Sequence, residues 1–428
     1  MNLLAEPSLP RGTRDYSTGE AIARREIVGV IEEMFKRFGF SPIETPTIEN
    51  LGTLYAKTYG EESGKEIYKI EGEDAALRYD FTVPLARFVA MNKDMPLPFK
   101  RYQIGSIFRK EEPQHMRYRE FLQADIDIVG SEEVISDAEV VALAGQILDE
   151  LEVRDYKILI NDRIILEGIL DSFGLEKGKE LDAIRVIDKL YKIGREEVVN
   201  QLSKFGLAQE KAYALIEFLS EEMSNEEKIN KVKANLGLEG EVKKLEELLS
   251  LIAKYGIKGE IVLDLTLARG LDYYTSFVWE FVKYDEEGKR LPTIVAGGRY
   301  DNLIGIFTKE KIPATGISIG IDRVFDVMNA KAERKTFARV FVANIGDTIP
   351  YALSVANYLR KSGIYTDINL TKRGISKQLE YANSLKFRYV LIVGESEQSS
   401  NKVKLRDMVT GNEELLGLDE AIKLIESG

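Results

Sequence analysis

KRYQIGSIFRKEEPQHMRYREFLQADIDIV, residues 100–129, is the stretch of this chain that decides the fold. Residues Tyr102–Arg109 and Tyr118–Val129 have the pattern of strands, and the polar residues Lys110–Met116 between them have the pattern of a loop. The stretch therefore predicts a long antiparallel hairpin.

Polar and charged side chains gather on one face of this hairpin. Because side chains alternate between the two faces of a strand, the return strand groups Arg119, Gln123, Asp125 and Asp127 with the aromatic ring of Phe121. Arg109 closes the first strand, and Glu111 follows two residues later. Such a face would suit a charged, partly planar ligand. A solvated face held by cross-strand ion pairs is the alternative.

Further helices and strands are predicted around the hairpin. Residues Glu20–Phe38 place apolar side chains three and four apart, which predicts a helix. The segment Phe40–Pro46 is extended, and its two prolines confine it to the edge of a sheet. Other strands are predicted at Glu260–Thr266, Tyr274–Val282, Pro292–Ala296 and Gly316–Gly320, the last leading into a helix.

Two other parts of the chain have patterns of their own. Residues 161–258 are strongly charged and helically periodic, which predicts an all-helical insertion. Residues 336–428 alternate between strands and helices, which predicts an α/β domain with a mostly parallel mixed sheet. Its predicted strands are Arg339–Asn344, Ile364–Ile368, Tyr389–Val393 and Val403–Met408, and its predicted helices are Ala352–Arg360, Ser376–Leu385 and Asp419–Ile425.

Two short runs place an arginine among glycines and aromatic residues. They are Leu267–Tyr274, which contains Arg269, and Ala296–Asp301, which contains Gly297, Gly298 and Arg299. An arginine in an apolar setting is costly to bury unpaired, and its planar fork can hold a carboxylate or phosphate. Each run therefore suggests an anionic ligand. A glycine-rich turn with an ion-paired arginine is the alternative.

Composition excludes several classes of protein. A chain of 428 residues with 44% hydrophobic and 30% charged residues is expected to be globular, with about two or three domains. It has neither the apolar stretch of roughly 20 residues that spans a bilayer nor a signal peptide. Without cysteine it has no disulfides, thiolate zinc sites or cysteine nucleophiles. We expect a cytoplasmic protein with no metal site built from its own side chains.

The net charge and the glycine motifs exclude further kinds of nucleic-acid and nucleotide binding. A net charge of −12 argues against a non-specific nucleic-acid binder, although residues 336–428 are close to neutral and suggest a module with a separate partner. The run Gly60–Glu66 is too short for a phosphate-binding loop, and no dinucleotide-binding glycine motif follows a strand. A nucleotide would therefore have to be bound by side chains on an antiparallel sheet.

The hairpin resembles motif 2 of the class II aminoacyl-tRNA synthetases. Helix Glu20–Phe38 with the segment ending at Pro46 resembles motif 1, and Gly316–Arg323 resembles motif 3. The runs Arg269–Tyr274 and Ala296–Asp301 are similar to two signatures of the histidyl-tRNA synthetases. The resemblance implies an α+β catalytic domain built on an antiparallel sheet with flanking helices (1–160 and 259–330), the helical insertion (161–258) and an anticodon-binding domain (336–428).

The resemblance also implies an activity and its residues. A histidine–tRNA ligase joins histidine to ATP, with Mg²⁺ bridging the phosphates, and then transfers the histidyl group to the 3′ end of its tRNA. The implied ATP-binding residues are Arg109, Glu111, Arg117, Phe121 and Arg323, and the implied catalytic residues are Arg269, Arg109 and Gln123. The implied histidine-binding residues are Asp80, Phe81, Thr82, Arg109, Gln123, Asp127, Arg269, Tyr273, Tyr274, Gly297 and Gly298.

Partners are implied less directly. The residues that would contact tRNA are Gln114, His115, Lys372, Arg373 and Lys404. The alternative for His115 is a solvated side chain without a partner role. The alternative for Lys404 is a solvated edge strand protected by its charges. The resemblance implies a homodimer through motif 1, which could equally pack within one chain. A catalytically silent, histidine-sensing regulatory paralogue and a tRNA-binding factor without chemistry are the competing functions.

Overall fold

The computed structural model describes residues 6–55, 65–268, 273–332 and 335–427. The chain forms two compact units: residues 1–14 with 27–329, and residues 15–26 with 330–428. Helix α1 (Thr18–Arg37) confirms the predicted helix Glu20–Phe38, beginning two residues earlier and ending one residue earlier. It is followed by Gly39 with a φ of 75°, a left-handed conformation that glycine adopts without steric cost.

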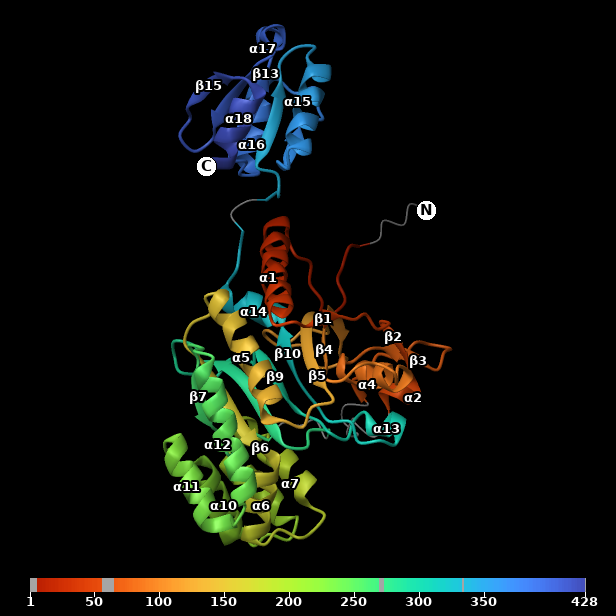
Figure 1. Ribbon diagram of the computed structural model, residues 1–428, viewed down its shortest axis with the longest axis vertical. Coiled ribbons are helices and arrows are strands. Elements are labelled where there is room, and N and C mark those ends of the chain that lie inside the picture. Colours follow the sequence, from red (N-terminus) through yellow and green to blue (C-terminus); the bar gives the residue numbers. More distant parts are fainter. Residues whose placement is uncertain (1–5, 56–64, 269–272, 333–334, 428) are drawn as a thin grey trace. The chain divides into compact units, whose positions relative to one another are not determined.

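An eight-stranded sheet forms the centre of the larger unit (Figure 1). Its spatial order is β1 (Ser41–Pro42), β4 (Phe99–Phe108), β5 (Glu120–Val129), β10 (Ala314–Gly320), β9 (Val295–Arg299), β8 (Phe277–Lys283), β6 (Tyr156–Asp162) and β7 (Glu260–Leu263). Neighbouring strands are antiparallel except at the two edges, where β1 with β4 and β6 with β7 are parallel.

The hairpin β4–β5 confirms the prediction made from residues 100–129. The two strands pair without interruption from Phe99 opposite Val129 to Phe108 opposite Glu120. The prediction for the segment Phe40–Pro46 is also confirmed, because β1 lies at the edge of the sheet, where a proline costs no ladder hydrogen bond.

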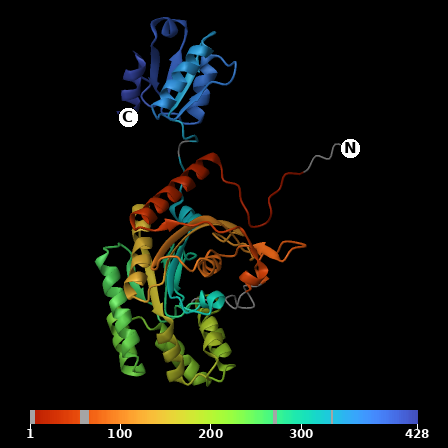
Figure 2. The same cartoon turned by 45° about the vertical axis from the view of Figure 1, so that its right-hand side comes forward.

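The two faces of this sheet have different coverings. Helix α5 (Val134–Glu150) packs against β5, β9 and β10, and Arg299 of β9 points toward it. Tyr300, the next residue, lies in an apolar core with residues of α4 (Thr82–Met91). Side chains that share the face of Tyr300 therefore point away from α5. Figure 2 shows α4 within the curve of the sheet.

Helices alone make up residues 163–259, all of which the structure describes, as predicted for the insertion. They are α6 (Arg163–Phe173), α7 (Glu180–Ile187), α8 (Leu190–Ile193), α9 (Arg195–Ser203), α10 (Gln209–Ser220), α11 (Asn225–Leu236) and α12 (Glu239–Lys254). Helix α6 follows β6 directly, and the Asp162 side chain accepts a hydrogen bond from the N–H of Ile164 at 2.8 Å. This cap satisfies one of the free N–H groups at the start of the helix.

The larger unit also contains short elements beside the sheet. They are the strands β2 (Ile48–Asn50) and β3 (Ala75–Leu77), which pair with each other, and the helices α2 (Leu51–Leu54), α13 (Gly305–Thr308) and α14 (Ile321–Met328). Helix α14 follows β10 directly and packs against β5 and β10. It thereby brings its first turn next to the motif 2 hairpin.

The C-terminal domain has a five-stranded mixed sheet in the order β12 (Thr366–Ile368), β11 (Val340–Asn344), β13 (Tyr389–Val393), β14 (Val403–Asp407) and β15 (Glu413–Leu416). The first three strands are parallel and the last two antiparallel to their neighbours. The helices are α15 (Ile349–Lys361), α16 (Ile375–Ser384), α17 (Glu395–Ser400) and α18 (Leu418–Ser427).

Two elements of this domain were not predicted, namely α17 and β15. Strand β15 pairs with β14 along its length, so β14 is an interior strand. The alternative that the strand around Lys404 is a solvated edge is therefore wrong. The outer strand is instead β15, whose Glu413 faces Arg406.

Candidate active site

A cleft opens on the face of the large sheet that points away from α5. The empty space in it, including space open to solvent, is about 740 Å³. Its lining comes from five separate parts of the chain: Asp80, Thr82, Arg109, Glu111, Met116, Tyr118, Phe121, Gln123, Tyr273, Tyr274, Thr293, Ile294, Ala296, Ser318, Gly320, Asp322 and Arg323.

Most of the residues expected to bind ATP or histidine lie in this one cleft. The residues brought together are Asp80, Thr82, Arg109, Glu111, Phe121, Gln123, Tyr273, Tyr274 and Arg323. Arg269 lies outside the described residues. The hairpin supplies its share because β5 presents Phe121 and Gln123 on the same face, as the two-residue period predicted.

Two arginines, Arg109 and Arg323, line the cleft. Arg323, at the start of α14, donates from Nη1 to the carbonyl oxygen of Thr293 at 2.7 Å and from Nε to that of Met116 at 3.3 Å. Burial, together with the charges of Arg109 and Arg117, lowers the pKa of Arg323 to about 10. Such a shift shows that like charges are held close together, and an anion in the cleft would relieve their repulsion.

Arg109 is held in place by aromatic rings. Its guanidinium carbon lies 4.5 Å from the ring centre of Tyr79 and 5.3 Å from that of Phe121, and its Nε donates to the carbonyl oxygen of Tyr79 at 3.2 Å. Arg117 forms an ion pair with the buried carboxylate of Glu111, which raises the pKa of Arg117. The motif 2 arginines are thus positioned by the hairpin and by the segment before α4.

The cleft lining also offers acceptors. Asp80 precedes α4, and its Oδ1 accepts a hydrogen bond from the N–H of Val83 at 3.1 Å. Gln123 donates from Nε2 to Oδ1 of Asp125 at 2.7 Å. Burial raises the pKa of Asp125 to about 7, although the charge of Arg101 opposes the shift. The lining of the cleft therefore combines cations with a carboxylate and an amide.

Replacing Asp125 with asparagine should change how stability depends on pH. The carboxyl binds a proton on folding, because its pKa rises from 3.8 to about 7, so wild-type stability falls as pH rises from about 4 to 7. The free energy of unfolding of the Asp125→Asn variant should not fall in this way, because asparagine does not titrate. As the pH rises from 5 to 7, the variant should therefore become more stable relative to wild type by about 2 kcal/mol. Urea unfolding at both pH values measures this gain, and parallel curves for the two proteins would refute it.

Asp127 lies behind the cleft. Its carboxylate is buried, with Oδ2 2.5 Å from Nη2 of the fully buried Arg101, and Oδ1 accepts a hydrogen bond from the hydroxyl of Tyr300. Burial raises the pKa of Asp127, and Arg101 lowers it. Asp127 is not among the described residues that line the cleft. It can therefore influence a ligand there only through neighbours such as Tyr300.

Phe81, Gly297 and Gly298 likewise support the cleft wall without lining it. The Phe81 ring is buried under the guanidinium of Arg78, at 4.7 Å. A Cβ at Gly297 would lie 2.1 Å from the carbonyl oxygen of Gly316, and one at Gly298 would lie 2.6 Å from the ring of Tyr274. A side chain at position 298 would therefore collide with the ring of Tyr274, which is one reason for the glycine there.

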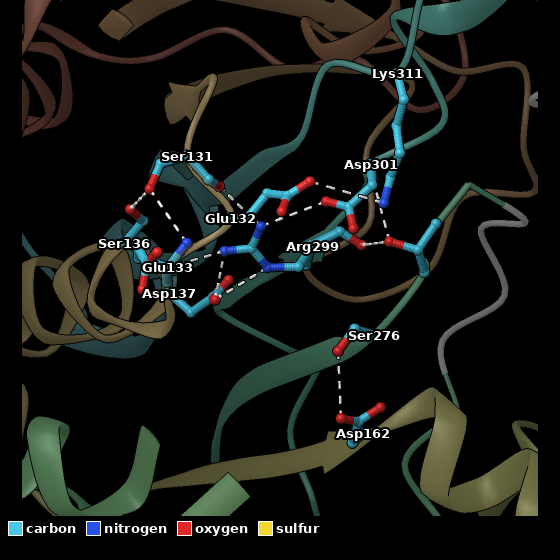
Figure 3. Close-up of polar contacts among 11 residues, drawn as sticks. Ser131, Glu132, Glu133, Ser136, Asp137, Asp162, Ser276, Arg299, Asp301 and Lys311 are labelled. Atoms are coloured by element: carbon cyan, nitrogen blue, oxygen red, sulfur yellow. Dashed lines mark hydrogen bonds and ion pairs between the residues drawn. The ribbon is translucent and has the colours of Figure 1, made fainter. Parts of the chain in front are cut away.

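Arg299 is not an anion-binding residue, which corrects one expectation from the sequence. It points toward α5, where Nη2 lies 2.6 Å from Oδ2 of Asp137 and Nη1 donates to the carbonyl oxygen of Ser131 at 2.9 Å (Figure 3). Asp301 lies 3.4 Å from Nη1. The ion-paired alternative is correct for this run, because the arginine falls on the face of β9 opposite the cleft.

Several lining residues were missed by sequence reasoning. Ser318 and Gly320 on β10 could have been found from strand alternation, since they share a face with Gly316. Asp322 lies in the stretch Gly316–Arg323 that resembles motif 3, and its Oδ2 accepts a hydrogen bond from the N–H of Leu122 at 2.7 Å. Thr293 and Ile294 precede β9 and carry no sequence signal that distinguishes them.

The residues expected to contact tRNA lie in three places. Gln114 and His115 are exposed in the hairpin loop, where Gln114 and Arg117 exchange backbone hydrogen bonds. Exposed Arg373 lines a hollow in the C-terminal domain together with Asp367, Asn369, Thr371 and Tyr381, among others, and Lys372 precedes it. Lys404 lies on β14, with Nζ 4.0 Å from a carboxylate oxygen of Glu413.

Two kinds of site are absent from the described part of the chain. No group of three or more histidine, cysteine, aspartate and glutamate side chains is arranged to hold a metal ion there. Nor does any described helix have the length and apolar character needed to cross a membrane.

The largely antiparallel sheet, its arginine-bearing hairpin and the cleft on one face define a class II aminoacyl-tRNA synthetase. The family model of histidyl-tRNA synthetase matches residues 12–324, and that of the anticodon binding domain matches residues 339–427. The chain belongs to the histidyl-tRNA synthetase family. It is an ATP-dependent ligase whose substrates are histidine and tRNA.

Full-length relatives support this assignment. The histidine–tRNA ligase of Phocaeicola vulgatus is 37% identical, over 99% of this chain and 100% of the relative. That of Clostridium tetani is 38% identical, over 99% of both chains. The crystal structure of histidyl-tRNA synthetase from Nostoc sp. PCC 7120 has a TM-score of 0.86 and 31% identity, and the match covers 99% of both chains.

Proposed function

We propose that the cleft binds ATP and histidine side by side and forms histidyl-adenylate there. The observation that carries this proposal is the convergence of Arg109, Arg323, Asp80 and Gln123 in one cleft. Arg117 does not line the cleft but is paired with Glu111, which does. The arginines would hold the phosphates, with Phe121 and Arg323 on either side of the adenine. Asp80, Thr82 and Gln123 would hold the α-ammonium group of histidine.

The chemistry requires an anion to attack an anion. The carboxylate of histidine forms a bond to the α-phosphorus as the bond from that phosphorus to the bridging oxygen breaks, and pyrophosphate leaves with the electron pair. Fixed guanidinium groups lower the barrier by stabilising charge that grows in the transition state. Arg109 would lie at the α-phosphate on one side and Arg269, proposed from the sequence signature, on the other.

Glu111 and Arg117 would change partners when ATP binds. The two side chains form an ion pair at the cleft, in which Glu111 is the partner that lines the wall, so Arg117 is held beside the proposed phosphate site. We propose that Arg117 turns to the outer phosphates and Glu111 accepts a hydrogen bond from the adenine amino group. Mg²⁺ fits this arrangement as part of the substrate, since it is commonly held by phosphates and few carboxylates.

The imidazole would lie against Tyr273 and Tyr274, which line the cleft with their ring centres 4.8 Å apart. A neutral imidazole has one donor and one acceptor nitrogen, and a site that satisfies both rejects side chains without them by roughly 10⁴-fold or more. Asp127 would contribute to this selection by holding the hydroxyl of Tyr300. Gly297 and Gly298 would contribute by leaving room for Tyr274.

We further propose that the chain is organised as a catalytic domain (1–160 and 259–330), a helical insertion (161–258) and an anticodon-binding domain (336–428). The hairpin loop with Gln114 and His115 would reach the acceptor end of tRNA. Lys372, Arg373 and Lys404 would contact the anticodon region. The protein would act in the cytoplasm as a homodimer through motif 1.

Replacing Arg373 with alanine should weaken the use of tRNA without affecting adenylate formation. Arg373 lines the hollow in the C-terminal domain, and loss of one such contact to an unstacked base or phosphate typically costs about 1–3 kcal/mol. We expect the KM for tRNA in aminoacylation to rise about tenfold or more, with ATP–pyrophosphate exchange unchanged. Lys361→Ala, at an exposed site at the end of α15, is the control. Equal effects of the two substitutions would refute the role of the hollow.

Histidine-dependent exchange of labelled pyrophosphate into ATP tests the proposed function as a whole. A ligase catalyses this exchange without tRNA, whereas a histidine-sensing regulator binds histidine without exchange and a tRNA-binding factor needs neither. The Arg109, Arg117 and Arg323 set and the anticodon-binding domain together favour the ligase. Histidine binding with no exchange would overturn the proposal.

A further inference from the structure

Asp125 is a buried carboxyl that the proposed reaction does not use. It lies two residues after Gln123 on β5, so the two side chains share the cleft face of the strand. Gln123 Nε2 donates to Asp125 Oδ1 at 2.7 Å. Gln123 lines the cleft and Asp125 does not, although both are buried, at 5% and 2% exposed.

Two polar neighbours of Asp125 are held by other groups, and a third contacts Asp125 itself. Gln103, opposite Asp125 on β4, exchanges hydrogen bonds of 3.1 Å with the hydroxyl of Thr45. Asp127, two residues further along β5, is held by Arg101 and Tyr300. Ser318, opposite Asp125 on β10, contributes a hydroxyl that lowers the pKa of the Asp125 carboxyl. Asp125 is therefore well placed to act on the amide of Gln123.

A carboxyl neighbour decides which way an amide points. The side chain of glutamine has a donor nitrogen and an acceptor oxygen at its two ends, and the two can exchange places by a half-turn. An ionised carboxylate only accepts hydrogen bonds, and a neutral carboxyl keeps an acceptor oxygen. With Nε2 turned to Asp125, the amide oxygen is turned away from it and is the end available to a ligand in the cleft.

We infer that Asp125 is a positioning residue that fixes the amide of Gln123 with its oxygen toward the cleft, so that Gln123 accepts a hydrogen bond from the α-ammonium group of histidine. This inference rests on the proposed function, which places that ammonium group beside Asp80 and Gln123. Without Asp125 the amide would also populate the reversed orientation, in which its NH₂ group faces the ammonium group. Histidine binding would then weaken, while ATP binding at the arginines would not.

Steady-state exchange kinetics of two Asp125 variants test this inference. Asp125→Leu is similar in size to the native residue and cannot accept a hydrogen bond, so the KM for histidine should rise about tenfold or more, the scale for a hydrogen bond to a charged group. The KM for ATP should stay within about threefold. Asp125→Asn keeps an acceptor oxygen but adds a donor, so it fixes the amide only partly and should raise the KM for histidine less than Asp125→Leu does. If Asp125→Leu does not fold, Asp125→Val takes its place.

A double variant separates positioning from general damage to the sheet. In the Gln123→Ala background, adding Asp125→Leu should leave the KM for histidine unchanged, because Asp125 acts through Gln123. Gln103→Met, which changes a buried amide on the neighbouring strand, should leave both KM values unchanged. A further rise in the double variant, or a KM for histidine in Asp125→Asn as high as in Asp125→Leu, would overturn the inference. A Gln123→Ala variant with a wild-type KM for histidine would instead overturn the proposed site.

Discussion

Replacing Arg323 with methionine should lower histidine-dependent ATP–pyrophosphate exchange by roughly 10²–10³-fold, the cost of removing one oriented donor that stabilises transition-state charge. Arg323 shares the cleft with Arg109, and its lowered pKa, about 10, reflects burial and repulsion from Arg109 and Arg117. The folded protein thus holds this charge at a cost in stability. A ligand that carries negative charge is the physical reason to keep it there.

The same variant separates a role in catalysis from a role in folding. Arg323 bonds to two backbone carbonyl groups, and its loss also relieves repulsion, so the melting temperature should change by only a few degrees. Arg323→Lys keeps the charge without the planar fork and should recover part of the exchange rate. Arg195→Met, at a half-exposed site in the helical segment, is the control. Exchange within about twofold of wild type would contradict the proposed role.

Replacing Arg299 with leucine should destabilise the protein by about 3–5 kcal/mol, because it leaves the carboxylate of Asp137 buried without its partner. Both side chains of this pair are almost fully buried, at 6% and 0% exposed. Burial raises the pKa of Asp137, and Arg299 opposes that shift. Arg299 also connects β9 to the residues just before α5, since it donates to the carbonyl oxygens of Ser131 and Glu133.

A double variant and a neighbouring ion pair are the controls for this prediction. Arg299→Leu with Asp137→Leu should recover a large part of the lost free energy of unfolding, because no unpaired charge remains. Lys311→Met removes the exposed pair of Lys311 and Glu132 in the same region (Figure 3) and should cost less than about 1 kcal/mol. Urea unfolding of the four proteins gives these values. Equal losses for Arg299→Leu and Lys311→Met would show that the pair is not a buried anchor.

The fold was predictable where a pattern is local. Residues 100–129 are long enough, and their central loop polar enough, to indicate the hairpin, and Pro42 marks the edge strand. Strand β15 was missed because Glu413-Glu414-Leu415-Leu416 does not alternate, and its pairing with β14 supplies the order that its own sequence lacks.

The site was predictable only in part from the residues themselves. Strand alternation placed Phe121 and Gln123 together, whereas the contributions of Asp80, Tyr273 and Arg323 to the same cleft came from the family resemblance. The sequence did not indicate on which face of β9 Arg299 lies, because two adjacent glycines give no apolar period there. The buried pair of Arg101 and Asp127 follows from the hairpin register, which sets these residues opposite each other.

A crystal structure with a non-hydrolysable histidyl-adenylate analogue tests the central claim most directly. We expect its phosphate within hydrogen-bond distance of Arg109, its ammonium group between Asp80 and the oxygen of Gln123, and its imidazole against Tyr273 and Tyr274. A phosphate bound away from Arg109 and Arg323, or an ammonium group facing the nitrogen of Gln123, would contradict this account.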